Sequence, residues 1–269
     1  MGGQILGDRY RVEKQLGKKL GRWTLLASDM HQDEQPVILK LISIDDDLHP
    51  DMLRLFEREM ETLKTLEHPA IPRYLDYFEV DLAKSQKALV LVQSYIDGIS
   101  ADKYLQQGRT FSEKEALKVA RSILKILTYL HDHQPSIVHR DIKPSNILLT
   151  TPPGKKTQIC LVDFGSVKTL VPRANQTTVL GLIGTEGYMA PEQLGGRPVK
   201  ASDLYSLGTT LITLATGMVP ANLPRRGQRI DLTRLNHFSP EFAAWLAQMT
   251  EIDISRRFSS AQVALQALG

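Results

Sequence analysis

The sequence predicts an α+β fold of two lobes, a small antiparallel β-sheet lobe with one helix and a larger, mainly α-helical lobe. Strand-like segments dominate up to Tyr95, and long amphipathic helices follow Asp97–Gly98. With 269 residues the chain is long enough for a sizeable core. We therefore expect domains at residues 1–96 and 97–269, with a hinge near Tyr95 and a ligand-binding cleft between the lobes.

The elements of the small lobe follow from short apolar runs and alternating polar residues. One helix, from about Met52 to Leu66, is expected to interrupt the strands. The expected strands are Tyr10–Leu16, Trp23–Ala27, Val37–Ile42 and Leu89–Gln93.

Two charged residues of this lobe fall on apolar faces. Lys40 shares a strand face with Ile38 and Ile42, which indicates a half-buried ammonium. Glu59 falls on the helix face of Leu63, unlike its acidic neighbours. Because an unpaired buried charge is costly, we expect Lys40 and Glu59 to form an ion pair. The alternative for Lys40 is that it extends its ammonium to the lobe edge.

The helices of the large lobe show recognisable ends. Ser112 and Glu115 have the spacing of a capping box, which predicts a helix from there to Leu130. A second helix is expected from a Ser202 cap to a stop at Gly217, and a last one over 259–268.

Composition excludes several classes of function. A net charge of +3 is too small to argue for nucleic acid or an anionic membrane, and no apolar run is long enough to cross a bilayer. Cys160 is the only cysteine, so an internal disulfide is excluded and a reducing, cytoplasmic location is expected. Its apolar neighbours indicate a small buried hydrophobe. A homodimer is compatible with the sequence, but no feature supports one.

Three motifs follow one another in the large lobe. The run His139-Arg140-Asp141-Ile142-Lys143-Pro144-Ser145-Asn146 comes first, then Asp163-Phe164-Gly165, then Ala190-Pro191-Glu192. Together they resemble the catalytic loop, the metal-binding motif and the end of the activation segment of protein kinases. The resemblance covers roughly residues 10–268 and is strongest to bacterial Ser/Thr kinases, in particular those of cyanobacteria.

The resemblance implies a role for each motif residue. Asp141 would orient the attacking hydroxyl and accept its proton, and Lys143 would neutralise charge on the transferred phosphoryl group. Asn146 and Asp163 would bind Mg2+, with Mn2+ as an alternative. Thr185 resembles the threonine that hydrogen-bonds the catalytic aspartate and lysine, which favours Ser/Thr over tyrosine as acceptor. Protein substrates and a role in signal transduction are therefore expected.

The same resemblance implies an ATP site. Lys40, paired with Glu59, would hold the phosphates. Thr24 and Ile38 stand where smaller or different residues are usual, so the roof of the adenine pocket is bulkier. The other expected ATP-site residues are Gly17 in the glycine-rich loop, Gln93 as gatekeeper, Ser94 and Ile96 in the hinge, and Leu148 as floor.

Regulation and support are also implied by the resemblance. Arg140 either pairs with a local acid or, with Lys168, receives a phosphate from the activation segment. Thr177 and Thr178 are the nearest acceptors, since Gly181 occupies the usual position of the phosphorylated threonine.

His139 is expected to pack beneath the loop. Asp203 should brace the catalytic-loop backbone, and Arg257 should pair with Glu192.

The glycine-rich loop departs from the family pattern. Only Gly17 is in register, Lys19 and Arg22 replace two glycines, and Gly21 is shifted by one position. Glycine lets backbone N–H groups approach phosphates, so its loss should stiffen the loop and limit that approach. Our hypothesis is that Lys18, Lys19 and Arg22 compensate with cationic side chains.

Three functions remain open at this point. The favoured one is an active ATP- and Mg2+-dependent Ser/Thr protein kinase, because every charged group that the chemistry needs is present. The main alternative is a pseudokinase that acts as a binding or scaffold module, which the altered glycine loop suggests. A small-molecule kinase is disfavoured because the segment from Gly184 to Glu192 resembles a peptide-docking surface.

Overall fold

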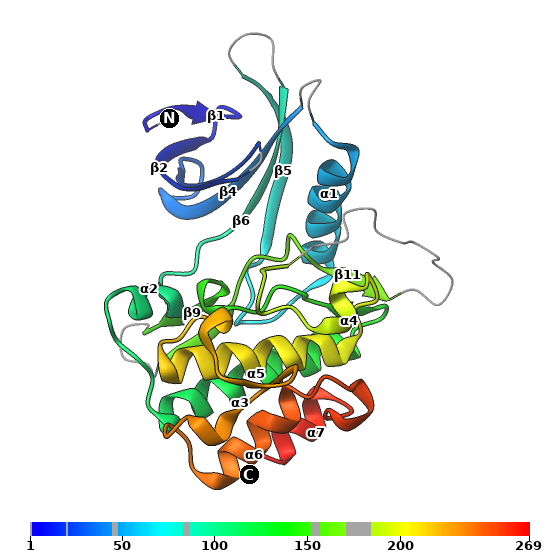
Figure 1. Ribbon diagram of the computed structural model, residues 1–269. Coiled ribbons are helices and arrows are strands. Elements are labelled where there is room, and N and C mark those ends of the chain that lie inside the picture. Colours follow the sequence, from blue (N-terminus) through cyan, green and yellow to red (C-terminus); the bar gives the residue numbers. More distant parts are fainter. Residues whose placement is uncertain (1, 20, 45–47, 83–86, 152–156, 171–183) are drawn as a thin grey trace. The chain divides into compact units, whose positions relative to one another are not determined.

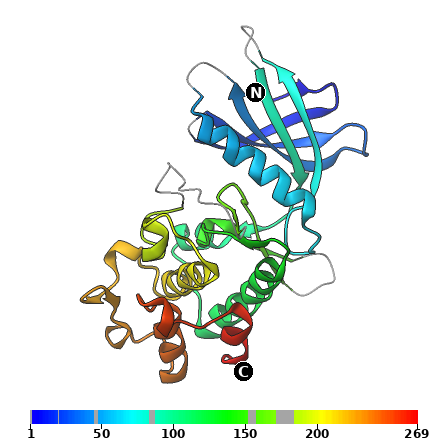
Figure 2. The same cartoon turned by 90° about the vertical axis from the view of Figure 1, so that its right-hand side faces the viewer.

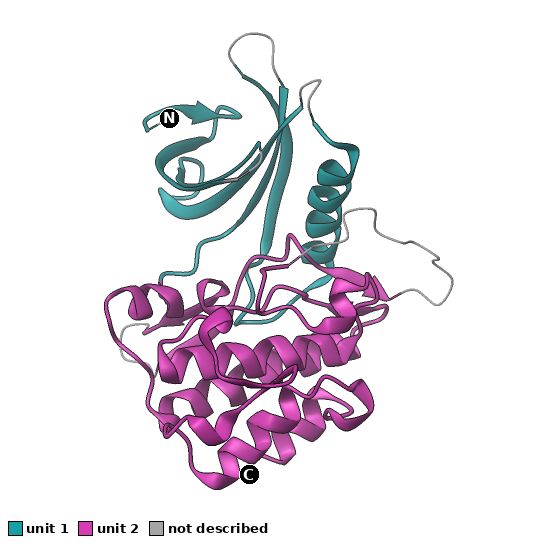
Figure 3. Cartoon of the chain, viewed as in Figure 1, with its two compact units in different colours: residues 1–97 teal, residues 98–269 magenta. Residues whose placement is uncertain are grey.

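The computed structural model describes residues 2–19, 21–44, 48–82, 87–151, 157–170 and 184–269, without the side chain of Lys19. The chain divides into two compact units, unit 1 over Met1–Asp97 and unit 2 over Gly98–Gly269 (Figure 3). Unit 1 is a sheet with one helix, and unit 2 is mainly helical. The α+β class is confirmed.

Unit 1 is built on a six-stranded antiparallel sheet in the order β1-β2-β3-β4-β6-β5 (Figure 1). Bulges in β2 and β5 interrupt the register, and such irregularities increase strand twist. The expected strands fall inside longer ones, and β5 was not predicted. The strands are β1 Ile5–Leu6, β2 Tyr10–Lys19, β3 Arg22–Asp29, β4 Gln35–Ile44, β5 Tyr74–Asp81 and β6 Lys87–Ser94.

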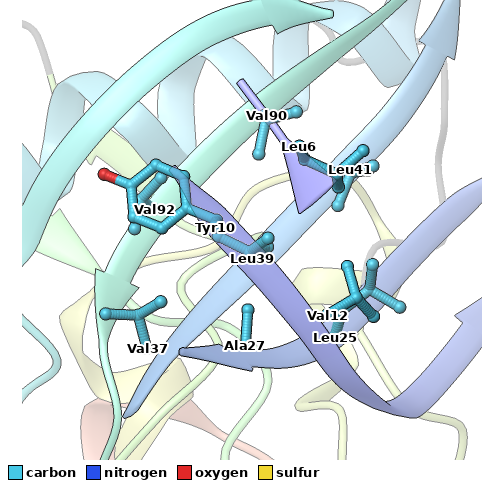
Figure 4. Close-up of a cluster of buried hydrophobic side chains, with 10 residues drawn as sticks. All are labelled: Leu6, Tyr10, Val12, Leu25, Ala27, Val37, Leu39, Leu41, Val90 and Val92. Carbon is cyan, nitrogen blue, oxygen red and sulfur yellow. The ribbon is translucent and has the colours of Figure 1, made fainter. Parts of the chain in front are cut away.

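The two faces of this sheet bury different residues. Alternation along β3, β4 and β6 sends one set of side chains into an apolar cluster that β1 and β2 complete (Figure 4). Its members are Leu6, Tyr10, Val12, Leu25, Ala27, Val37, Leu39, Leu41, Val90 and Val92. The other set, which includes Ile38 and Lys40, lies on the opposite face.

Helix α1, Pro50–Thr65, lies along the sheet of unit 1 (Figure 2). Proline fits the first turn because that turn needs no N–H donor, and the His49 ring accepts the Asp51 N–H at 3.3 Å. The apolar stripe of α1 is buried together with Glu59.

Unit 2 is centred on two long helices, α3 Glu113–Asp132 and α5 Lys200–Thr216. The capping box is confirmed: Ser112 Oγ accepts the Glu115 N–H at 3.3 Å, and Glu115 Oε2 accepts the Ser112 N–H at 2.9 Å. The predicted Ser202 cap is wrong, because α5 begins two residues earlier. Ser202 Oγ instead accepts the Val199 N–H at 3.0 Å from inside the first turn.

Gly208 allows α5 to approach the end of helix α6, Pro240–Met249, closely. A Cβ at this position would lie 2.7 Å from Thr250 Cγ2 and 2.9 Å from Met249 Cβ. Gly217, the predicted stop of α5, has φ of 72°, a conformation that favours glycine.

Short strands of unit 2 deliver the motif residues. Strand β8 leads into the catalytic loop and β10 leads into Asp163. In the described part of unit 2 these strands pair as β10-β9-β7, β11-β8 and β12-β13. No helix in the described ranges is long and apolar enough to cross a membrane. The remaining elements are α2 Ala101–Gln106, α4 Pro191–Leu194, α6 Pro240–Met249, α7 Ala261–Gln266, β7 Ile99–Ser100, β8 Ser136–Val138, β9 Ile147–Thr150, β10 Gln158–Leu161, β11 Lys168–Leu170, β12 Arg225–Arg226, β13 Arg229–Ile230, and the 3-10 turns η2 Pro144–Asn146, η3 Pro220–Asn222, η4 Leu232–Arg234 and η5 Ile254–Arg256.

Candidate active site

Three polar side chains of unit 2 form a closed hydrogen-bonded cluster. Lys143 Nζ donates to Asp141 Oδ2 at 2.8 Å and to Thr185 Oγ1 at 2.5 Å. Thr185 Oγ1 donates in turn to Asp141 Oδ1 at 2.8 Å. Asp141 is buried, whereas Lys143 and Thr185 are half-buried. The cluster therefore holds a carboxylate and an ammonium beside each other in a fixed orientation.

Asn146 is oriented by the same aspartate. Its Nδ2 donates to the Asp141 carbonyl oxygen at 2.8 Å and to Asp141 Oδ2 at 3.2 Å. Because the amide nitrogen is used in this way, the amide oxygen Oδ1 is turned to the other side, where Ser145 Oγ lies 3.4 Å away. A carbonyl-type oxygen fixed like this is a ligand that hard cations accept.

Asp163 follows β10 in an unusual backbone conformation. Its φ is 66°, and the Gly165 N–H lies 3.5 Å from its Oδ1. The chain before it is tied to the catalytic loop, since the Val162 N–H donates to the Asn146 carbonyl at 2.9 Å. Positive φ in a residue other than glycine is sparsely populated and is maintained only where neighbouring contacts fix it.

Asp203 ties three segments of unit 2 together. This carboxylate is completely buried and accepts the backbone N–H groups of His139 at 2.9 Å and Arg140 at 2.8 Å. His131 Nε2, from the last turn of α3, lies 2.9 Å from the same carboxylate. The predicted support of the catalytic loop by Asp203 is present, and it holds Arg140 at φ of 70°.

Replacing Asp203 by Ala should lower the free energy of unfolding by about 4 kcal/mol, because two buried N–H donors lose their acceptor. Asp203→Asn keeps one acceptor oxygen and should cost about half as much. Urea unfolding monitored by circular dichroism measures both changes. Asp132→Ala, at an exposed aspartate nearby in α3, is the control and should change stability by less than about 0.5 kcal/mol. Equal effects at Asp203 and Asp132 would contradict the support role.

His139 packs beneath the loop, as the sequence predicts. Its ring is completely buried and meets the Phe164 ring edge-on, with the ring centroids 4.9 Å apart. Burial lowers the pKa of His139, and the nearby carboxylates of Asp203 and Asp141 oppose this only in part. The imidazole is therefore neutral near pH 7 and serves packing rather than proton transfer.

Arg140 and Lys168 come from two paired strand ends. Arg140 Nε donates to the Ser166 carbonyl, and Lys168 lies opposite Val138 in the β8–β11 ladder. Arg140 is buried and Lys168 is half-buried. Thr177, Thr178 and Gly181 lie outside the described residues, so phosphate reception by Arg140 and Lys168 stays a prediction.

Glu192 and Arg257 form the predicted ion pair. The guanidinium donates to both carboxylate oxygens, through Nη1 at 2.8 Å and Nη2 at 3.2 Å, and Nη1 also donates to the Ala201 carbonyl at 2.6 Å. Ser202 Oγ adds a bond to Glu192 Oε1 at 2.7 Å. Burial favours the protonated carboxyl, but the bonds from Arg257 and Ser202 outweigh it and hold the pKa of Glu192 below its usual value.

This lowered pKa predicts a pH-dependent contribution to stability. The contribution is complete above the unfolded-state pKa of Glu192, about 4.3, and is lost as pH falls through the lower folded-state pKa. Glu192→Gln should cost about 3 kcal/mol at pH 7, because it leaves Arg257 buried without its counter-charge, and less at pH 3.5. Chemical unfolding at both pH values measures this, with the exposed Glu186→Gln as control. A cost that does not change with pH would refute the prediction.

Two side chains that hydrogen-bond the backbone of the catalytic loop were not predicted from the motifs. Gln193 Nε2 donates to the Arg140 carbonyl at 2.7 Å, and Thr210 Oγ1 donates to the Ile142 carbonyl at 3.1 Å. Thr210 lies two helical turns after Asp203 on the same helix face, a periodicity that could have identified it. Gln193 has no such signal, because only the fold brings α4 to the loop.

In unit 1, Lys40 Nζ donates to Glu59 Oε1. The Lys40 side chain is 11% exposed and that of Glu59 is fully buried, so the predicted pairing of two costly charges is confirmed. Arg22 Nη2 lies 3.6 Å from Glu59 Oε2. The buried Glu59 carboxylate therefore contacts two cations, Lys40 and Arg22.

The strand register gathers most of the expected ATP-site residues of unit 1. Thr24 lies opposite Lys40, Ile38 lies opposite Gln93, and Gly17 lies opposite Thr24. Because opposite residues in an antiparallel ladder point to the same face, all of them share the face that carries Lys40.

The hinge and floor residues are placed as follows. Ser94 ends β6, and its N–H donates to the Arg73 carbonyl at 2.9 Å, so this donor is already used. Ile96 is half-buried two residues further on, and Leu148 lies on β9 of unit 2.

The backbone conformation of Gly21 accounts for a glycine at this shifted position of the loop. The ladder of β2 and β3 ends at Lys19 opposite Arg22, and Gly21, directly before Arg22, has φ of 70°. This left-handed conformation favours glycine. Gly17 has open space where a Cβ would be, so its own backbone does not require glycine.

Comparison with known proteins gives a consistent result. A family profile described as protein kinase domain matches residues 10–267. The chain is 34% identical to serine/threonine-protein kinase B of Synechocystis sp. over 98% of its own length and 46% of that protein. It is 35% identical to serine/threonine-protein kinase PknA of Nostoc sp. over 98% of its length and 48% of that protein. The chain thus spans about half the length of these curated relatives.

Among solved structures, the kinase domain of Mycobacterium tuberculosis PknI matches with a TM-score of 0.73. The sequences are 25% identical, and the match covers 100% of this chain and 98% of that one.

Proposed function

The chain belongs to the protein kinase family, and from this premise we propose that it transfers the γ-phosphoryl group of ATP to Ser or Thr hydroxyls of proteins. The hydrogen-bonded cluster of Asp141, Lys143 and Thr185 carries this proposal, because it provides a fixed proton acceptor beside a fixed positive charge. The names of the relatives, which are serine/threonine-protein kinases, support the same acceptor class.

We propose the following division of labour. Residues 1–96 form the nucleotide-binding lobe, in which Lys40 binds the ATP phosphates and Thr24, Ile38, Gln93, Ser94 and Ile96 surround the adenine. Residues 97–269 carry the catalytic loop, the activation segment and the peptide-docking surface. Leu148, on β9 of residues 97–269, stays a predicted contact of the adenine.

In the transfer step, Asp141 orients the acceptor hydroxyl and takes its proton. The hydroxyl oxygen forms a bond to the γ-phosphorus as the bond to the bridging oxygen of ADP breaks. Lys143 neutralises charge on the phosphoryl oxygens, and Thr185 holds both side chains in position. Because the catalysis consists of positioning and charge, the closed cluster suits it.

Protein kinases use Mg2+ with ATP, and the donor set here fits this ion. Asn146 offers an amide oxygen and Asp163 a carboxylate, both hard ligands, and Mg2+ commonly takes its remaining ligands from water and phosphate. Among the described residues no cluster of three or more His, Cys, Asp or Glu forms a separate metal site. Bound Mg2+ would neutralise the ATP phosphates. Mn2+ prefers similar ligands.

Two further points belong to the proposal. Arg140 and Lys168 would receive a phosphate from Thr177 or Thr178, and the β8–β11 pairing that brings their strands together supports this. We also propose a part in signal transduction and a cytoplasmic location, because a chain with a single cysteine needs no oxidising compartment for an internal disulfide. The proposed partners are protein substrates.

The test is incubation of the purified protein with Mg-ATP and a generic basic protein, read by mass spectrometry. We expect phosphate on Ser or Thr, including Thr177 or Thr178, and none when EDTA removes the metal. No incorporation by a protein that circular dichroism shows to be folded would favour the pseudokinase. All charged groups of the proposed chemistry are present, namely Lys40, Glu59, Asp141, Lys143, Asn146 and Asp163.

A further inference from the structure

Arg22 makes an unexpected contact in unit 1. It opens β3, at a position where the family pattern has glycine, and its guanidinium lies 3.6 Å from Glu59 Oε2. In the part of the chain that the structure describes, Glu59 is the one acidic side chain within ion-pair distance of Arg22. The Arg22 side chain is 24% exposed, whereas that of Glu59 is fully buried.

The sheet register explains why this contact forms. Arg22 lies opposite Ile42, and two residues along the same strands Thr24 lies opposite Lys40. Arg22 and Lys40 are therefore diagonal neighbours on the same face of the sheet. Glu59 of α1 contacts both of them, through Oε2 and Oε1 respectively.

Arg22 places a second cation beside Lys40. Both side chains contact the Glu59 carboxylate. Two like charges held close together repel, and a nearby anion relieves that repulsion. A guanidinium has five N–H donors in a planar fork that matches phosphate oxygens, and the contact with Glu59 is made by Nη2.

Building on the proposed function, we propose that Arg22 binds the phosphates of ATP together with Lys40, and that Glu59 positions both cations. A side-chain guanidinium would then supply the attraction that backbone N–H groups supply in a glycine-rich loop. This role makes Arg22 a determinant of affinity for the phosphates and not for the adenosine part of the nucleotide.

The experiment compares the binding of Mg-ATP and of adenosine by isothermal titration calorimetry. For Arg22→Gln we expect the Kd for Mg-ATP to rise at least about tenfold, as for loss of one charged hydrogen-bond donor. The Kd for adenosine should stay within about twofold, because adenosine has no phosphate for Arg22 to bind.

Two further variants serve as controls. Arg22→Lys keeps the positive charge but loses the planar fork of donors, so it should raise the Kd for Mg-ATP measurably but by less than Arg22→Gln does. Arg11→Gln removes an arginine of the same sheet that pairs with Glu34 at 2.8 Å, and should leave both Kd values unchanged. Thermal unfolding without nucleotide checks that each variant is folded, and Arg22→Lys carries the test if the Gln variant is not.

Several outcomes would overturn the proposal. Mg-ATP affinity that is unchanged in Arg22→Gln would show that the guanidinium does not bind phosphate. An equal loss of affinity for Mg-ATP and for adenosine would show that Arg22 maintains the shape of the pocket and does not bind phosphate. In Arg22→Lys, a loss as large as that expected for Gln would show that positive charge is not what matters. If the natural protein binds adenosine but not Mg-ATP, or binds neither, the proposed function fails as well, which separates that failure from one confined to Arg22.

Discussion

Replacing Asp141 by Asn is expected to lower the rate of phosphate transfer by about 1,000-fold, because the acceptor hydroxyl loses the group that takes its proton. The binding of Mg-ATP should change by less than about threefold, since the cost falls on the transfer step. Quench-flow measurement of a single turnover gives the rate, and calorimetry gives the Kd.

The local hydrogen bonds make this a clean substitution. The new amide oxygen can accept from Lys143 and Asn146, as Asp141 Oδ2 does, while the amide nitrogen faces the Thr185 hydroxyl, which can rotate to accept. The variant should therefore fold. Asp132→Asn, at an exposed aspartate, is the matched control and should keep the full rate. A rate within tenfold of the natural protein in Asp141→Asn would refute the proton-acceptor role.

The second large effect is expected for Lys40→Met, which should lower kcat/KM by about 100- to 1,000-fold. Loss of one preorganised cation commonly has an effect of this size on transition-state stabilisation. Methionine has a similar length and fits an apolar strand face, so the sheet of unit 1 should persist. Steady-state kinetics with a peptide acceptor measure the loss, and retained activity would remove Lys40 from the site.

Stability measurements distinguish the loss of the Lys40–Glu59 ion pair from the loss of catalytic activity in this variant. Lys40→Met leaves the Glu59 carboxylate buried with one cationic contact fewer, so unfolding should become easier by about 2 kcal/mol. Adding Glu59→Gln should recover most of that stability without recovering activity. Lys87→Met, at an exposed lysine of β6, is the control and should change neither quantity appreciably. Recovery of activity in the double variant would contradict phosphate binding by Lys40.

Much of the site in unit 2 could be predicted from the sequence, because its residues lie in short motifs whose local geometry is self-contained. Asp141, Lys143 and Asn146 lie within six consecutive positions, so their mutual contacts depend on one turn of backbone. The Lys40–Glu59 pair was predictable for another reason. A charge on an otherwise apolar face needs a partner. The strand carries one such charge, Lys40, and the helix carries one, Glu59.

Other contacts could not be predicted because they depend on how distant elements meet. Gln193 reaches the Arg140 carbonyl only once α4 is docked, and Arg22 reaches Glu59 only through the register of β3 and β4. The start of α5 was misjudged because Ser202 suits a cap, whereas its hydroxyl bonds both Val199 and Glu192. Long-range packing decides between such alternatives, and local propensity does not.

The burial of Cys160 has a practical consequence for labelling. With its pKa raised to about 11, the Cys160 thiol is protonated at pH 7, and the buried side chain is also shielded from reagents. A cysteine introduced at an exposed position such as Asp132 should therefore react with a maleimide dye far faster than the native thiol. A single fluorophore can thus be attached to a cysteine introduced in unit 2 without removal of Cys160.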